Sequence, residues 1–160
     1  VAQRLGQPAA LAAAGTACAL GVVAVLAVAG DKTLQRDDWR GAARALGPIE
    51  DVRVVTAPPG GLVPLRYYLP HVQRFTGGQA STREVDYVAI AERDGSARPR
   101  PPRPDLSPLE APGFSETQRT LTPEFTVLRL RADSPRPVFS SAVDTGLDGK
   151  PATPLIVSRP

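Results

Sequence analysis

The residues best suited to bind a ligand form one short cluster, Arg66-Tyr67-Tyr68, with His71 close behind it. A tyrosine ring combines an apolar body with a polar hydroxyl, and the neighbouring arginine adds a positive charge. Such a set is suited to contact lipid headgroups or a lipid-linked phosphate at a membrane surface. The alternative is structural, with Tyr67 or Tyr68 in the core and its hydroxyl in contact with water.

The histidine and cysteine counts exclude several kinds of active site within this chain. His71 is the only histidine, so neither a histidine triad nor a multi-histidine metal site can be built from these residues alone. Cys18 is the only cysteine, which excludes an intrachain disulfide and a cysteine-based metal site. No motif in the sequence identifies a catalytic residue, and we expect no metal site and no cofactor in this chain.

Two further motifs have simpler explanations than chemistry. The segment from Asp144 to Gly149 resembles a calcium loop, but Leu155 stands where a bidentate glutamate is needed, so we interpret it as a turn. Asp37 and Asp38 are adjacent carboxylates, yet adjacent residues on a helix point in different directions. Capping of a helix explains this pair better.

The elements that position these residues begin with an uncharged apolar stretch from Pro8 to Gly30. As a helix it would be about 34 Å long, enough to cross a hydrocarbon core of roughly 30 Å. We therefore predict a transmembrane helix within residues 1–30. A cleaved signal peptide is the alternative, with Arg4 as its charged start and Ala27-Val28-Ala29 as its cleavage site.

The composition of this stretch favours the last span of a polytopic protein over a lone anchor. Small residues let transmembrane helices approach closely, and they dominate its first half. Because Val1 stands where an initiator Met is expected, we expect a piece of a longer protein. By the positive-inside rule, the basic residues after the helix would place residues 31–160 in the cytoplasm.

Residues 31–160 show the alternation of helices and strands that is typical of an α/β domain. Asp37 or Asp38 caps a predicted helix that ends at Leu46, with Trp39, Ala42, Ala43 and Leu46 on one face. We expect a small α/β sandwich with a partly parallel sheet. A second helix is predicted at 62–69, and strands at 51–56, 84–91, 124–131, 137–141 and 155–158.

The distribution of charge and proline bears on partners. The chain has 19 Lys and Arg against 16 Asp and Glu, a balance too even to argue for nucleic acid, which usually calls for a clustered basic face, so we expect no nucleic-acid partner. Arg129 and Arg131 alternate with apolar residues and are expected to point outward. The Pro-rich segment 95–112 is expected to be an exposed loop with polyproline II character, and docking of a partner to its Pro-Arg-Pro-Pro motif is the alternative.

The order of segments over residues 8–132 carries a resemblance to a known family. An apolar helix is followed by a helix of the pattern D-W-R-x-A-A-x-x-L from Asp38 to Leu46, then by a strand and the segment Pro59 to Leu69. Gly113-Phe114 then precedes F-T-V-L-R-L-R, which ends at Arg131. This order resembles the C-terminal end of bacterial membrane glycosyltransferases of the GT-C class, in particular protein O-mannosyltransferases and aminoarabinose transferases, which use polyprenyl-phosphate sugars.

The resemblance implies a polytopic protein of the cell membrane, with residues 31–160 on the extracytoplasmic side. This opposes the positive-inside rule, and we follow the resemblance. The implied partners are the lipid bilayer, the remaining transmembrane helices of the parent protein and a polyprenyl-phosphate sugar. The family's catalytic acidic residues lie in an early loop outside this chain, so the fragment itself is expected to be non-catalytic.

Two functions therefore remain open. In the first, the chain is the C-terminal fragment of a glycosyltransferase, with Asp38, Trp39 and Arg40 in structural roles and the Arg66-Tyr67-Tyr68 and His71 cluster contacting substrate or lipid headgroups. In the second, it is a single-pass or secreted α/β binding module without catalytic activity.

Overall fold

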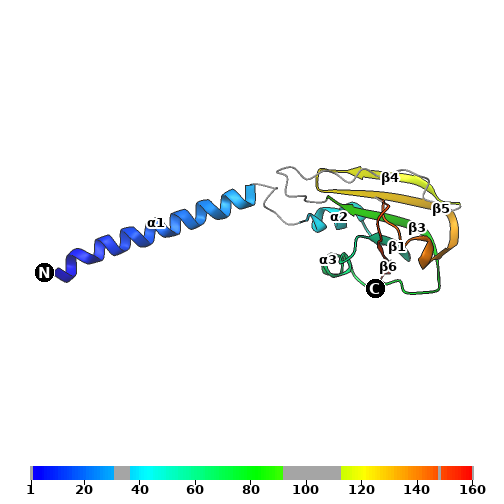
Figure 1. Ribbon diagram of the computed structural model, residues 1–160, viewed down its shortest axis with the longest axis horizontal. Helices are drawn as coiled ribbons and strands as arrows, with labels where there is room; N and C mark the ends of the chain where they lie inside the picture. The colour runs from blue at the N-terminus through cyan, green and yellow to red at the C-terminus, as the bar shows by residue number, and fades with distance from the viewer. Residues whose placement is uncertain (1, 31–36, 92–112, 148, 160) are drawn as a thin grey trace. The chain divides into compact units, whose positions relative to one another are not determined.

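The computed structural model describes residues 2–30, 37–91, 113–147 and 149–159, in two compact units, Val1–Arg36 and Asp37–Pro160 (Figure 1). The first unit contains one helix, α1 (Ala2–Gly30). From Ala9 to Gly30 no residue is buried within this chain, and the helix is long and apolar enough to cross a membrane. The same properties fit a signal sequence, so both interpretations of this stretch remain.

The second unit is built on a six-stranded sheet with the order β2-β6-β1-β3-β5-β4. β1 and β3 are parallel neighbours, whereas the other neighbouring pairs are antiparallel. This arrangement confirms the predicted α/β fold with a partly parallel sheet. The strands are β1 (Arg53–Ala57), β2 (Val72–Arg74), β3 (Gln79–Ile90), β4 (Ser115–Leu121), β5 (Phe125–Phe139) and β6 (Thr153–Val157).

Helices α2 (Trp39–Leu46) and α3 (Leu62–Tyr68) cover one face of the sheet (Figure 1). Asp38 caps α2, because its carboxylate accepts the N–H of Gly41 at 2.8 Å. Gly47 ends α2 with a φ of +65°, a conformation that glycine adopts without strain. The helix buries its apolar face against the sheet.

The two faces of the sheet hold separate apolar clusters. Beneath the helices, Leu46 and Leu65 pack against Val55, Val88 and Val127 of the sheet. On the opposite face, the cluster is completed by residues after β5 and before β3 in the chain: Phe75, Val143 and Leu147 pack with Val54, Val85, Tyr87, Leu128 and Leu130. A one-turn 3-10 helix, η1 (Ser140–Ala142), belongs to this covering segment.

The strands differ from the sequence prediction most at β2, β3, β4 and β5. β3 begins at Gln79, five residues before the predicted start, and β5 runs to Phe139, so that the strand predicted at 137–141 is the end of β5. β2 and β4 were not predicted. The predicted Pro-rich loop at 95–112 lies outside the described residues.

Candidate functional site

Three arginines and a tyrosine line a pocket of about 570 Å³ beside α2. Arg40 and Arg44 are one turn apart on the exposed side of this helix, whose other side is buried. Tyr68 comes from the end of α3, and Arg159 follows β6. The pocket thus joins residues from both ends of the second unit.

The pairing of β2 with β6 explains why Arg159 reaches this pocket. Val72 of β2 lies opposite Val157 of β6 in an antiparallel ladder. Two residues beyond this pair on each chain segment, Pro70 and Arg159 both line the pocket. The antiparallel register therefore sets the C-terminal arginine opposite the end of α3.

The pocket has a positive charge and an apolar floor. None of its lining residues is acidic, and its apolar part includes Ala43, Ile49 and Leu69. Among the described residues, no ion pair involves Arg40, Arg44 or Arg159. A pocket of this kind favours a ligand with an anionic group and an organic part.

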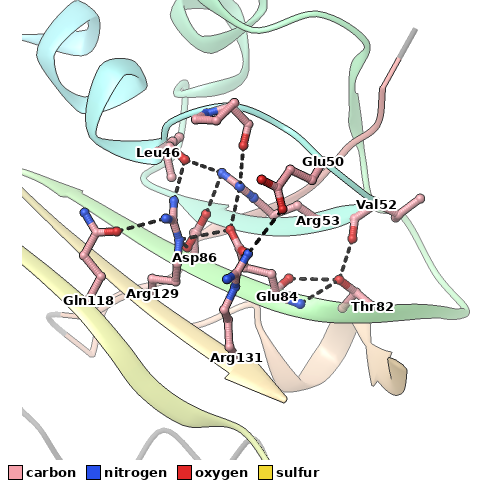
Figure 2. A network of polar contacts seen from close by, with 11 residues as sticks. Leu46, Glu50, Val52, Arg53, Thr82, Glu84, Asp86, Gln118, Arg129 and Arg131 are labelled. Carbon is pink, nitrogen blue, oxygen red and sulfur yellow. Dashed lines mark hydrogen bonds and ion pairs between the residues drawn. The ribbon is translucent and has the colours of Figure 1, made fainter. Parts of the chain in front are cut away.

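Five charged side chains form an ion cluster on the helix-covered face of the sheet, and three of them, Arg53, Glu84 and Asp86, are buried (Figure 2). Arg53 of β1 lies 2.6 Å from Glu84 and 3.1 Å from Asp86, both on β3. From β5, Arg129 lies 3.0 Å from each carboxylate, and Arg131 donates to Glu84 at 2.8 Å. The strand register produces this arrangement, because Glu84 pairs with Arg53 and Arg131 while Asp86 pairs with Arg129.

The ion cluster also holds the end of α2. Arg53 and Arg129 both donate to the carbonyl oxygen of Leu46, and Arg53 donates to that of Pro48 at 2.9 Å. The Leu46 carbonyl belongs to the last turn of α2 and the Pro48 carbonyl lies just beyond it, so neither has a partner within the helix. Arg129 further donates to Gln118 of β4 at 2.9 Å (Figure 2). The cluster therefore ties the helix that carries Arg40 and Arg44 to three strands.

Asp86 is the most strongly perturbed carboxylate of the cluster. Its side chain is fully buried, and burial raises the pKa of Asp86 to about 6 despite the charges of Arg53 and Arg129. Oδ2 of Asp86 and Oε1 of Glu84 lack a well-directed hydrogen bond, although each lies within ion-pair distance of Arg53. The contacts of Asp86 are those of an ionised carboxylate at neutral pH.

A bulge in β3 sets the position of Glu84. The register with β5 shifts between Thr82 and Glu84. The hydroxyl of Thr82 donates to the carbonyl oxygen of Val52 at 2.6 Å and accepts the N–H of Glu84 at 3.0 Å. This places the Glu84 carboxylate on the helix-covered face, in phase with Asp86 two residues later.

The four residues Arg66, Tyr67, Tyr68 and His71, predicted from sequence to contact substrate or headgroups, lie at the end of α3 and in the turn that follows it. Tyr67 and Tyr68 are 84% and 42% exposed, so neither is the core residue of the structural alternative. Their rings meet edge to face at 5.0 Å. Arg66 donates to the carbonyl oxygen of Val72 at 3.1 Å, which secures the turn after α3, and the exposed His71 occupies that turn with a φ of +50°. Tyr68 is the one member of the four that lines the arginine pocket.

The three residues assigned structural roles differ in what they do. Asp38 is the cap of α2. Trp39 is partly buried against the apolar cluster, where it approaches Gly61 so closely that a Cβ there would lie 2.8 Å from its ring. Arg40 is exposed and lines the arginine pocket.

The expectation that Arg129 points outward is wrong. Its side chain is 14% exposed, because Glu84 and Asp86 on the neighbouring strand neutralise it in the interior. Arg131 is 50% exposed and lies at the edge of the same cluster. The missed signal is that Arg129 shares its strand face with the buried residues Val127 and Phe125.

A second hollow, of about 330 Å³, lies at the carboxyl ends of the parallel strands β1 and β3. Ligands of α/β proteins often bind at such an edge. Trp39, Pro59 and Ile90 contribute its apolar wall, and its charged residues, Asp37 and Lys150, are of opposite sign. The arginine pocket is therefore the stronger candidate for an anionic ligand.

The remaining predicted motifs give no site of their own. Gly146 donates to the carbonyl oxygen of Lys150 at 2.8 Å, as expected for a turn in the described part of 144–149. Cys18 is exposed on α1. Across residues 2–30, 37–91, 113–147 and 149–159, no group of three or more His, Cys, Asp or Glu side chains could hold a metal ion.

Comparisons of the chain with protein families, with curated proteins and with solved structures find no match. Any proposal on the function of the chain therefore rests on its own sequence and structure. Three features bear on function: the apolar helix α1, the arginine pocket, and the buried ion cluster that holds the end of α2 beside the pocket.

Proposed function

We propose that this chain is the C-terminal fragment of an integral membrane glycosyltransferase that transfers a sugar from a polyprenyl-phosphate donor to an extracytoplasmic acceptor. The observation that carries the proposal is an exposed apolar helix, Ala9–Gly30, followed after six residues by a folded α/β unit that begins at Asp37. The elements of that unit follow in the order on which the resemblance rests: α2 with Asp38-Trp39-Arg40, then β1, then α3.

In this proposal the fragment is non-catalytic. A general base must reach a proton of the acceptor, so Glu84 and Asp86, which are buried and held by arginines, do not serve as that base. The catalytic acids are expected in a loop of the parent protein outside this chain. The domain lies on the extracytoplasmic side of the membrane, where it covers the active site, binds the acceptor or stabilises the helix bundle.

The test is a transfer assay with a radiolabelled polyprenyl-phosphate sugar. Membranes that contain the complete natural protein are expected to transfer label to an extracytoplasmic acceptor, and membranes that contain residues 1–160 alone are expected to transfer none. Transfer by the 160-residue chain alone would place the catalytic groups in this domain and contradict the proposal.

The side of the membrane can be tested by thiol labelling, because Cys18 is the only cysteine. A Cys18→Ser chain that also carries Ser134→Cys would present one thiol at an exposed position of β5. A membrane-impermeant maleimide is expected to label it in intact cells. Labelling only after the cells are permeabilised would place the domain in the cytoplasm.

A single-pass or secreted binding module is the second candidate, and the arginine pocket favours it. A pocket with three arginines and no acidic lining residue can bind a ligand without performing chemistry. In the secreted form, cleavage after Ala29 would release residues 30–160 into the soluble fraction, whereas the first candidate predicts that the domain stays with the membrane.

A further inference from the structure

We propose that the pocket lined by Arg40, Arg44, Arg159 and Tyr68 binds the phosphate or diphosphate group of an amphipathic ligand. This assigns a binding site to the α/β unit itself. It goes beyond the proposed function, since it holds equally for a domain of a glycosyltransferase and for a binding module.

The charges of the pocket select an anion. Guanidinium groups present rigid pairs of N–H donors that match phosphate oxygens, and they keep their charge at any physiological pH. Arg40 and Arg44 approach from α2, and Arg159 comes from the end of β6. Because no lining residue is acidic, no carboxylate within the pocket offsets the three charges.

The volume and the floor of the pocket indicate that the phosphate belongs to a larger molecule. A volume of about 570 Å³ is in the range of small-molecule sites rather than that of a bare ion. Ala43, Ile49 and Leu69 provide apolar contact for an organic group attached to the phosphate. Tyr68 is 42% exposed and adds a ring with a hydroxyl donor at the same wall.

The buried ion cluster makes the pocket compatible with an anion. The C-terminal end of a helix carries a partial negative charge, which would repel a phosphate bound near Gly47 and Pro48. Arg53 and Arg129 donate to the carbonyl oxygens at this end. They neutralise those carbonyls and fix α2, so Arg53 and Arg129 are positioning residues for Arg40 and Arg44.

The first experiment measures binding of inorganic pyrophosphate to the complete 160-residue chain in nanodiscs of phosphatidylcholine, by titration calorimetry. Saturable binding is expected, and Arg40→Gln and Arg44→Gln are each expected to weaken it about tenfold. Glutamine keeps a good helix former at both exposed positions, and circular dichroism checks the fold of each variant.

The matched control is Arg74→Gln. Arg74 is an exposed arginine on β2 that lies outside the pocket, so its removal changes the net charge equally. Its affinity for pyrophosphate is expected to stay within twofold of the wild type. The proposal is overturned if the wild type shows no saturable binding, or if Arg74→Gln weakens binding as much as Arg44→Gln does.

A second measurement identifies the source of the phosphate. Amide hydrogen exchange of residues 40–49 is compared between nanodiscs of phosphatidylcholine and nanodiscs that also contain phosphatidylglycerol. Slower exchange in the anionic discs, lost in Arg44→Gln but kept in Arg74→Gln, assigns the pocket to a lipid headgroup. Exchange that responds to pyrophosphate but not to lipid assigns it to a soluble phosphorylated ligand.

Discussion

The sheet face beneath α2 has two halves that differ in what fills them. In one half, Val88 of β3 lies opposite Val127 of β5, and both pack with Val55 of β1 against the helices. In the other half, Asp86 and Glu84, two and four positions before Val88 on β3, pair with arginines from both neighbouring strands. Both halves are buried because their residues lie on the same helix-covered face of the sheet. A charged residue is tolerated on this face where the neighbouring strands supply partners of opposite charge.

Substitutions in the two halves should lower the free energy of unfolding for different reasons. Removing apolar atoms costs transfer free energy and leaves a cavity, so the loss scales with the atoms removed. Removing one member of an ion cluster leaves the others buried and unpaired, so the loss exceeds the net contribution of the contact. Substitutions in the same strand can separate these two behaviours.

The largest effect is expected for Asp86→Ala. It leaves Arg53 and Arg129 without one of their two buried carboxylate partners and should lower the free energy of unfolding by ~3–5 kcal/mol. Urea denaturation of the complete chain in detergent micelles, followed by the fluorescence of Trp39, measures it, since Trp39 is the only tryptophan. A loss below that of an apolar truncation would mean that the cluster is not held by mutual pairing.

The charged half should also respond to pH. Burial raises the pKa of Asp86 from 3.8 to about 6, so between these values the folded state keeps a proton that the unfolded state has released. Stability from this group is therefore present at low pH and lost as the pH rises through that window. The free energy of unfolding of the wild type relative to Asp86→Asn should fall by ~2–3 kcal/mol between pH 4 and pH 7. A difference that stays constant with pH would show that the folded state does not alter this pKa.

In the apolar half, Val88→Ala is the matched substitution, since Val88 lies two residues after Asp86 on the same face of β3. Loss of two buried methyl groups should cost ~2 kcal/mol, with no dependence on pH. The same denaturation experiment, carried out at pH 4 and at pH 7, measures this loss and its dependence on pH. A pH-dependent loss would mean that the two halves are energetically coupled.

The smallest effect is expected at the exposed start of α2. Asp38→Ala removes the carboxylate that accepts the N–H of Gly41 and should cost ~1 kcal/mol. Thermal unfolding followed by circular dichroism measures it, and Asp37→Ala is the control, because Asp38 is the residue that caps the helix. Equal losses from both substitutions would mean that the negative charge before the helix, and not the hydrogen bond of Asp38, stabilises α2.

Local features of the sequence were sufficient to predict α2 and α3. Asp38, the spacing of Ala42 and Leu46, and the stop at Gly47 all lie within a few residues of one another, and the structure confirms them. The exposed strand β4 has no alternation of apolar residues, and β5 continues through Pro135 and Pro137, which are unusual in strands. These elements exist because neighbouring strands pair with them, which a local pattern does not contain.

The candidate site could not have been predicted in the same way. Its arginines come from positions as far apart as Arg40 and Arg159, and only the pairing of β2 with β6 brings the latter to the pocket. The ion cluster likewise depends on the register of three strands, which sets Arg53, Glu84 and Arg131 in one row. Of the residues selected from sequence for substrate or headgroup contact, Tyr68 alone lies in the pocket.

The central claim, that residues 1–160 are the C-terminal part of a membrane glycosyltransferase, is tested most directly by sequencing the natural gene upstream of Val1. The proposal predicts several hundred codons that encode repeated apolar spans, with an acidic residue in an early loop. A reading frame that starts within a few codons of Val1 would contradict it and leave an anchored or secreted α/β binding module.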